Sequence, residues 1–233
     1  MTQKRVVVLT GAGISAESGL RTFRDGDGLW EEHRIEDVAT PQAWIADPGL
    51  VWRFYQARRR QLLEVKPNAA HQALATLATK MDHFSLITQN VDDLHERAGN
   101  ESTIHMHGSL KTLRCEQSGR SEVRMEEADF CDEFLYCQCC AVPQRLRHDI
   151  VWFGEMPMHM EAIHSAVEKS DLFIVVGSSG HVYPAADLVN IANAAGATTI
   201  LVNLEAPLNA ENFDEVHLGK AGELLPNILE ALS

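Results

Sequence analysis

Short apolar runs alternate along the chain with longer segments in which apolar positions recur at helical spacing. The runs at 6–9, 84–88, 150–153, 172–176 and 199–204 consist mainly of apolar residues and predict buried strands. The segments at 50–63, 69–81, 185–195 and 223–232 predict helices. Strands separated by helices predict an α/β fold, in which a mostly parallel sheet is covered by helices on both faces and binds ligands at the carboxyl ends of its strands.

The composition narrows the class of protein. With 45% hydrophobic and 23% charged residues, the 233-residue chain differs from disordered, collagen-like and membrane-spanning proteins. The apolar run at 172–176 is too short to cross a bilayer, and no cleavable export segment precedes the first strand. A formal charge of -13 and the lack of a basic stripe with interleaved aromatic residues make nucleic-acid binding the weakest hypothesis. We therefore expect a cytoplasmic protein that binds neither membranes nor specific nucleic acids.

Five cysteines, four of them between 131 and 140, indicate a reducing compartment and a metal site rather than a disulfide framework. Periodicity fails between about 115 and 140, as expected of a small module supported by a metal. Ser118 stands three residues after Cys115, where a second thiol would complete a strong zinc motif. The fourth ligand could then be Cys139 or Cys131, or the site is weak or vestigial. A zinc ion in such a closed site would be structural. The expected ligands are Cys115, Cys137 and Cys140.

A glycine-rich turn follows the first predicted strand. The residues Gly11 to Ala16 fit the pattern G-x-G-x-x-A, in which glycines let the backbone approach a pyrophosphate. The alternative is a strand-to-helix turn that simply requires glycine. A dehydrogenase would show a second strand ending in an acidic residue about 20 residues later, but the segment 18–37 is a polar loop. An acidic strand end occurs instead at Glu205, so the nucleotide is expected to be held differently from that of a hydride-transfer enzyme.

Seven ordered motifs resemble those of the sirtuins, the NAD-dependent protein-lysine deacylases, and are most similar to the bacterial class III branch. The motifs are Gly11-Ala12-Gly13-Ile14-Ser15, Thr22-Phe23-Arg24, Thr88-Gln89-Asn90-Val91-Asp92, His107-Gly108, Phe153-Gly154-Glu155, Gly177-Ser178-Ser179 and Asn203-Leu204-Glu205. The resemblance implies a Rossmann-like NAD-binding domain formed by 1–114 and 141–233, with part of a helical substrate-side lobe within 20–66. It also implies a small, zinc-ribbon-like Cys-rich module at 115–140 and an acyl-lysine peptide bound between the two domains.

The resemblance implies a reaction that moves the acyl group of lysine to ADP-ribose and releases nicotinamide and free lysine. His107 would be the general base, Asn90 and Gln89 would hold the ribose and the acyl oxygen, and Asp92 would hold the nicotinamide carboxamide. The alternative for Asn90 and Asp92 is capping of the helix predicted at 91–98. The implied NAD contacts are Gly11, Ala12, Gly13, Ser15, Phe23, Arg24, Trp30, Gln89, Asn90, Val91, Asp92, Gly177, Ser178, Ser179, Asn203, Leu204, Glu205 and Ala221.

The helix predicted at 50–63 contains the residues that indicate which acyl groups the protein binds. At about 100° per residue, Arg58 falls on the apolar arc that includes Tyr55, whereas Arg59 and Arg60 are expected to be solvated. A guanidinium on an apolar face needs a partner. The pair matches the Tyr-x-x-Arg motif of class III sirtuins, which implies binding of succinyl-lysine besides acetyl-lysine. Pairing of Arg58 with a structural carboxylate is the alternative.

Two other functions fit the same motifs. A sirtuin-like ADP-ribosyltransferase would transfer ADP-ribose to protein. A non-catalytic NAD-sensing adaptor would bind NAD and recruit partners, but it would not need the set of Asn90, Asp92 and His107. We expect a monomeric enzyme.

Overall fold

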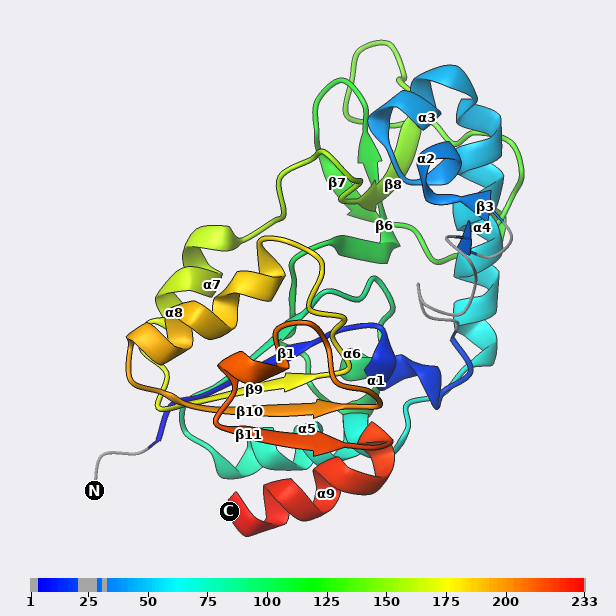
Figure 1. Ribbon diagram of the computed structural model, residues 1–233. Helices are drawn as coiled ribbons and strands as arrows, with labels where there is room; N and C mark the ends of the chain where they lie inside the picture. The colour runs from blue at the N-terminus through cyan, green and yellow to red at the C-terminus, as the bar shows by residue number, and fades with distance from the viewer. Residues whose placement is uncertain (1–3, 21–28, 31–32, 233) are drawn as a thin grey trace.

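The computed structural model describes residues 4–20, 29–30 and 33–232, which fold into a broad lower lobe and a narrower upper lobe (Figure 1). A six-stranded parallel sheet forms the centre of the lower lobe, in the order β11-β10-β9-β1-β4-β5. Its strands are β1 (Val6–Thr10), β4 (Phe84–Thr88), β5 (Ile104–His105), β9 (Leu172–Val176), β10 (Thr198–Asn203) and β11 (Glu215–Leu218). Because strand order reverses at the central β1, a crevice for a ligand is expected beside its carboxyl end.

Helices cover both faces of this sheet, as expected for parallel strands buried on both sides. On β1, Val6 and Val8 pack toward α5 (Ala69–Lys80) and α9 (Ala221–Leu232). The alternate residues, Val7 and Leu9, pack toward α7 (Met160–Val167) and α8 (Leu188–Ala194). The alternation follows from the two-residue period of a strand. The predicted parallel sheet with helices on both faces is confirmed.

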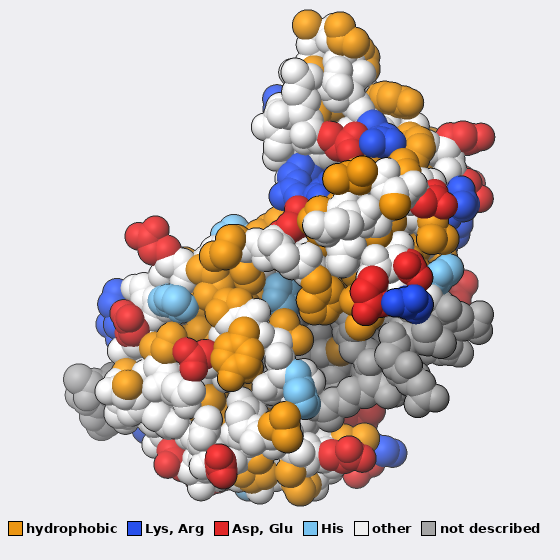
Figure 2. All heavy atoms as spheres, turned by 45° about the horizontal axis from the view of Figure 1, so that its top comes forward, with side chains coloured by type: hydrophobic (Ala, Val, Ile, Leu, Met, Phe, Trp, Pro, Cys, Tyr) orange, Lys and Arg blue, Asp and Glu red, His pale blue; other side chains and the backbone are white. Residues whose placement is uncertain are grey.

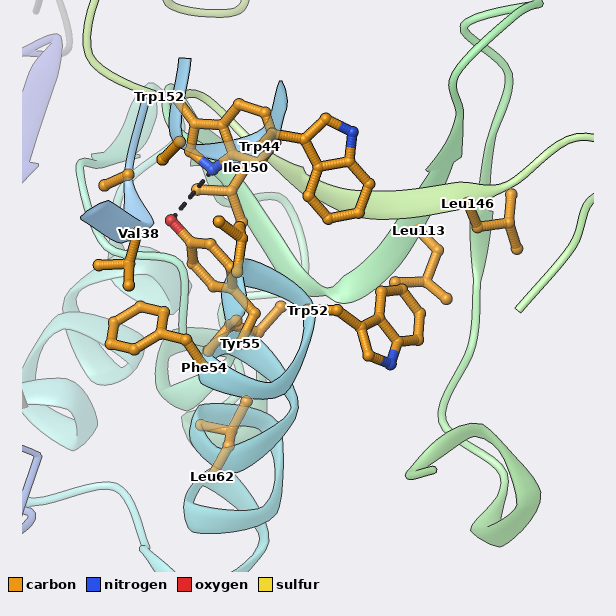
Figure 3. Packing of buried hydrophobic residues seen from close by; sticks show 14 of the residues in the cluster. Val38, Trp44, Trp52, Phe54, Tyr55, Leu62, Leu113, Leu146, Ile150 and Trp152 are labelled. Atoms are coloured by element: carbon orange, nitrogen blue, oxygen red, sulfur yellow. Dashed lines mark hydrogen bonds between the residues drawn. The ribbon is translucent and has the colours of Figure 1, made fainter. Parts of the chain in front are cut away.

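The upper lobe is built on a three-stranded antiparallel sheet, β7-β6-β8. Its strands are β6 (Gly108–Cys115), β7 (Ser121–Val123) and β8 (Leu146–Ile150), and the remaining elements of the lobe are the β2 (Leu29–Trp30) and β3 (His33–Arg34) hairpin, α2 (Ile35–Val38), α3 (Pro41–Ala46) and α4 (Pro48–Glu64). Figure 3 shows the core between α4 and the sheet, where Trp52 points toward Leu113 and Leu146 while Tyr55 points toward Trp152. The helix α4 begins after Asp47, whose carboxylate accepts a hydrogen bond from Leu50 N at 2.9 Å.

One expectation differs from this architecture. The segment 150–153 is not a strand of the parallel sheet: β8 ends at Ile150 and belongs to the antiparallel sheet. That strand buries Arg147, His148 and Asp149, so its sequence does not look apolar. The predicted domain boundaries at 114 and 141 stay predictions, but the sheet that holds the Cys-rich segment extends from Gly108 to Ile150. Within the described ranges, no helix has the length and apolar character needed to cross a membrane.

Candidate active site

A large cavity lies at the carboxyl edge of the parallel sheet. Thr10 pairs with Thr88 on one side and with Val176 on the other, so β1, β4 and β9 end at the same level. The residues that follow these strands line a cavity of about 880 Å³, which also receives residues of the upper lobe. In Figure 2, hydrophobic side chains gather across the middle of the molecule, between its upper and lower parts. The cavity therefore lies where a parallel sheet of this topology binds ligands.

Gly11 and Gly13 let two strand ends approach each other. A Cβ on Gly11 would lie 2.8 Å from the carbonyl oxygen of Gly177, and a Cβ on Gly13 would lie 2.8 Å from the Cα of Gly177. Gly13 N donates a hydrogen bond to the same carbonyl at 2.9 Å. The helix α1 (Gly13–Ala16) that follows has a single turn. The close packing against Gly177 thus requires glycine at both positions. Because these glycines have no side chain, their backbone also faces the cavity.

Polar side chains meet at the floor of the cavity. Ser15 Oγ donates to Asp92 Oδ2 at 3.0 Å and accepts from Asn90 Nδ2 at 3.1 Å. The other oxygen of Asp92 accepts from Leu94 N at 3.1 Å, at the start of α6 (Leu94–Ala98), whose N-cap residue is Asp93. Burial raises the pKa of Asp92, and the hydrogen bonds from Leu94 and Ser15 oppose that shift. The three side chains form one network whose members all line the cavity.

The geometry around His107 determines its tautomer. His107 Nδ1 lies 3.0 Å from the carbonyl oxygen of Gln89. A carbonyl oxygen only accepts, so Nδ1 carries the hydrogen and Nε2 keeps its lone pair. Burial lowers the pKa of His107, while the bond to Gln89 opposes the shift. An imidazole with a free lone pair and a lowered pKa is suited to accept a proton at neutral pH.

Ser178 holds the side chains of two cavity residues, Gln89 and Asn203, in place. Its hydroxyl accepts a hydrogen bond from Gln89 Nε2 at 3.0 Å, and its carbonyl accepts one from Asn203 Nδ2 at 2.9 Å. Ser178 thereby fixes two neighbouring side chains that follow β4 and end β10. The predicted site residues that line the cavity are Gly11, Ala12, Gly13, Ser15, Tyr55, Arg58, Gln89, Asn90, Val91, Asp92, His107, Gly177, Ser179, Asn203, Leu204, Glu205 and Ala221. Phe23 and Arg24 lie outside the described residues, as does the side chain of Trp30.

One end of the cavity is formed by α4. Tyr55 is fully buried and Arg58 is 8% exposed, and both line the cavity. Trp152 Nε1 donates to Tyr55 Oη at 3.1 Å, drawn as the dashed line in Figure 3. Because an indole N–H only donates, the Tyr55 hydroxyl is the acceptor in this bond. Burial raises the pKa of Tyr55, and the nearby Arg58 charge opposes the shift.

The expectation that Arg59 is solvated is wrong. Its side chain is fully buried, and its guanidinium donates to the carbonyl oxygens of Arg124 and Asp129. These acceptors follow Arg59 by 65 and 70 residues, so nothing near it in the sequence indicates burial. Arg60 is exposed, as expected.

The cysteine cluster forms a set suited to zinc. The Sγ atoms of Cys115, Cys137, Cys139 and Cys140 all lie within 4.8 Å of one another. Two of these separations, Cys115–Cys140 at 3.7 Å and Cys139–Cys140 at 3.8 Å, agree with the edge of about 3.8 Å that Zn–S bonds of about 2.3 Å give a tetrahedron. Backbone N–H groups of Ser118 and Gln144 also point at the sulfurs of Cys115 and Cys137.

Cys139 completes this set. Its Sγ lies 3.1 Å from Ser118 Oγ, so it occupies the side of the cluster that the missing thiol would have filled. Cys131 lies outside the cluster, where its thiol donates to the carbonyl of Glu133. Of the two alternatives for a fourth ligand, the geometry favours Cys139.

Sequence reasoning did not indicate the contact of Trp152 with Tyr55, and it missed the cavity residue Lys220. Trp152, which orients Tyr55, lies in the segment interpreted as a strand. Lys220 also lines the cavity, after the short strand β11 that the pattern did not reveal. The sequence did contain a signal for Lys220, because this lysine lies between two glycines at the start of a predicted helix.

Comparisons with known proteins agree with this geometry. The chain matches the Sir2 family over residues 11–184. It is 54% identical over 235 residues to the NAD-dependent protein deacylase of Escherichia coli strain K12, covering 100% of this chain and 83% of the relative. A Sir2 homologue in complex with NAD superposes with a TM-score of 0.89 at 40% identity, covering 100% of this chain and 92% of that one. A Sir2–p53 peptide–NAD+ complex superposes with a TM-score of 0.83 at 29% identity, covering 100% and 95%. The chain belongs to the Sir2 family.

Proposed function

We propose that the protein is an NAD-dependent protein-lysine deacylase that removes both acetyl groups and acidic acyl groups such as succinyl. The observation that carries the proposal is a single cavity lined both by Tyr55 and Arg58 of α4 and by Asn90 and His107, which follow strand ends. The names of the E. coli relative and of the NAD complex support the reaction and the co-substrate.

In the proposed reaction, bound NAD supplies the ribose that receives the acyl group. His107 Nε2 takes a proton from a ribose hydroxyl, since Nδ1 is held as a donor by Gln89. Asn90 and Asp92, tied to each other through Ser15, orient polar groups of the substrates. The Asp92 carboxyl, which accepts from Ser15 and Leu94, has further lone pairs with which to accept a hydrogen bond from a carboxamide N–H.

Beside α4, an acyl carboxylate would bind to Arg58 and Tyr55. A guanidinium offers paired donors to a carboxylate, and the Tyr55 hydroxyl, which Trp152 orients, lines the same cavity. The remaining wall is apolar at Leu62 and Ile150, which suits the methyl group of an acetyl substrate. The resulting specificity is for small acyl groups, with preference for those that end in an acid.

The test replaces each arginine of the run 58–60 by Met and measures deacylation of matched acetyl-lysine and succinyl-lysine peptides by mass spectrometry. Arg58→Met should lower kcat/KM for the succinyl peptide roughly 10-fold to 100-fold, because a hydrogen bond to a charged group contributes about 1.5–3 kcal/mol. Acetyl removal should change little. The control is Arg60→Met, whose guanidinium lies at the surface and should affect neither substrate.

Several outcomes separate the alternatives. Wild-type protein that removes neither group with NAD would contradict the deacylase proposal, and NAD-dependent labelling of protein by ADP-ribose would favour a transferase. Equal losses on both peptides would contradict the acyl pocket alone.

We also propose that the enzyme is a cytoplasmic monomer, in keeping with five unpaired thiols, and sedimentation of the purified protein tests the oligomeric state.

A further inference from the structure

Two neighbouring stripes of α4 have different partners. Tyr55, Arg58 and Leu62 line the cavity. Trp52, Gln56 and Arg59 lie roughly 100° further round the helix axis and contact the segment 124–132 of the upper lobe. Arg58 and Arg59 are adjacent, so any rotation of the helix that moves one side chain also moves the other. The contacts of the second stripe with the segment 124–132 therefore determine where the side chains of the first stripe point.

Arg59 is the centre of the second stripe. Its Nη1 donates to the carbonyl of Asp129 at 3.2 Å and to Gln56 Oε1 at 3.0 Å, and its Nη2 donates to the carbonyl of Arg124. The guanidinium carbon lies 4.8 Å from the centre of the Phe130 ring. Burial lowers the pKa of Arg59 to about 10, and the Asp129 carboxylate opposes the shift. The group thus keeps its charge at neutral pH and bonds to two points of the same segment.

Neighbouring side chains hold the same segment. Gln56 Nε2 donates to the carbonyl of Asp129 at 2.9 Å, and Trp52 Nε1 donates to the carbonyl of Cys131 at 3.1 Å. The segment itself is folded by the 3-10 helix Glu127–Asp129, in which Asp129 accepts from Glu126 N. The acceptors are backbone carbonyls at fixed positions, so they define one orientation of α4.

Hydrophobic packing alone does not require a guanidinium here. A buried cation costs free energy of desolvation, and an apolar side chain of similar volume often serves stability as well or better. A planar group with five donors, in contrast, fixes both a direction and a distance to its acceptors. This difference favours a role in orientation over a role in stability.

We propose that Arg59 is a positioning residue for the acyl pocket: by fixing α4 to the segment 124–132, it holds Arg58 in the orientation that selects acidic acyl groups. This inference rests on the proposed deacylase function. Arg59 does not touch the substrate. It acts through the helix, so its loss should affect the acyl group that depends on Arg58 and spare the one that does not.

The experiment measures kcat and KM for the acetyl and succinyl peptides with Arg59→Met, Arg59→Lys and the control Arg53→Met, at an exposed position of the same helix. Arg59→Met should raise KM for the succinyl peptide on the order of tenfold, because small misplacements of a binding group are costly. Its kcat on both peptides and its KM for the acetyl peptide should stay within about twofold of wild type. Arg59→Lys, which keeps the charge and can still reach one carbonyl, should recover part of the succinyl affinity.

Each result decides between orientation and stability. Equal losses on both peptides, in step with a lower unfolding midpoint, would overturn the proposal and leave Arg59 a structural residue. If Arg59→Met does not fold, Gln56→Met tests the same stripe, since it removes one donor to Asp129 and one acceptor for Arg59; an unchanged succinyl KM would then overturn the proposal. Wild-type protein without desuccinylase activity would instead contradict the proposed acyl specificity, which separates the two failures.

Discussion

Buried histidines next to the cavity stay neutral because their surroundings exclude water. Thr10 Oγ1 donates to Thr88 Oγ1, so His95 Nε2, 2.9 Å from the same hydroxyl, must be the donor in its own bond. Burial lowers the pKa of His95 well below its ordinary value, and burial lowers that of His71 to about 4. His105 differs: burial lowers its pKa, but the hydrogen bond and charge of Glu96 outweigh burial and raise it. Partners therefore decide which imidazoles carry charge.

The pH dependence of the reaction should follow His107. The base is active only when Nε2 is unprotonated, so activity is lost as pH falls through its pKa. Burial lowers that pKa from 6.5, and the midpoint of the acid limb of kcat/KM should therefore lie below 6.5. The measurement is acetyl-peptide turnover between pH 5 and 8, a range chosen to bracket the unperturbed value of about 6.5.

Replacement of the same residue gives the matching control. His107→Asn should lower kcat roughly 10²-fold to 10⁴-fold, the usual contribution of a general base. His83→Asn, at an exposed position before β4, should leave both kcat and the pH profile unchanged. A midpoint above 6.5, or full activity of His107→Asn, would contradict the assignment.

At the scale of single residues, the sequence predicted which side chains lie together at the cavity, but not all of the groups that they contact. The glycines, Asn90 and Asp92 follow predicted strands, whose ends meet at one edge of a parallel sheet, whereas His107 was implied only by the family resemblance, because the two-residue strand β5 was not predicted. Arg59 was not, since its acceptors lie in a distant segment. The role of Cys139 was left open, because only the fold of the loop decides which thiol is near Ser118.

At the scale of elements, the junction between His107 and β6 depends on Gly108. Gly108 has φ of 82°, and a Cβ there would lie 1.9 Å from the carbonyl oxygen of Asp149 on β8. The pairing of β6 with β8 also shifts register between Gly108 and Leu113. The close approach of the two strands thus fixes the start of β6 directly after the proposed base.

Gly108→Ala should destabilise the protein far more than Gly119→Ala. Both glycines have positive φ, but a Cβ on Gly119 meets nothing within 4 Å, so only backbone strain of about 1–2 kcal/mol applies there. At Gly108 the clash with backbone adds to the strain, and a loss of roughly 3–5 kcal/mol is expected. Urea unfolding of the two variants measures the difference; similar midpoints would show that β6 and β8 separate easily.

Elements with a strong apolar pattern were predicted well and mixed ones were not. The strands β4 and β9 have the predicted bounds, because every central strand of a parallel sheet is buried on both faces. The strand β8 was missed because ion pairs, such as that of Arg147 with Glu155 at 2.9 Å, replace apolar contacts along it. Hydrophobic pattern carries no signal for such a strand.

At the scale of the whole molecule, the cysteine cluster joins separate parts of the upper lobe. Cys115 ends β6, and Cys137 to Cys140 lie in the loop before β8. Cys115 and Cys137 are also part of the hydrophobic core that contains Trp52 and Tyr55. A metal bound here would stabilise the lobe that carries one wall of the cavity.

Removal of zinc should therefore lower stability and activity together. Cys139→Ser should release zinc at lower chelator concentration than wild type, because it removes the fourth thiolate. Cys131→Ser should behave like wild type, since its thiol lies outside the cluster. Metal analysis and thermal unfolding after chelation measure both effects. Equal zinc retention by the two variants would indicate a three-thiolate site.

The continuity of the cavity from Arg58 to Glu205 has a consequence for inhibitor chemistry. A compound that links an acid-ended acyl-lysine mimic to a nucleoside would occupy both ends without leaving the protein surface. Joining two weak fragments in this way raises affinity by roughly 10²-fold to 10⁴-fold when the linker matches the span. Because the acid would be recognised by a side chain on α4 and the nucleoside by backbone turns, chemists could vary one fragment for selectivity while keeping the other constant.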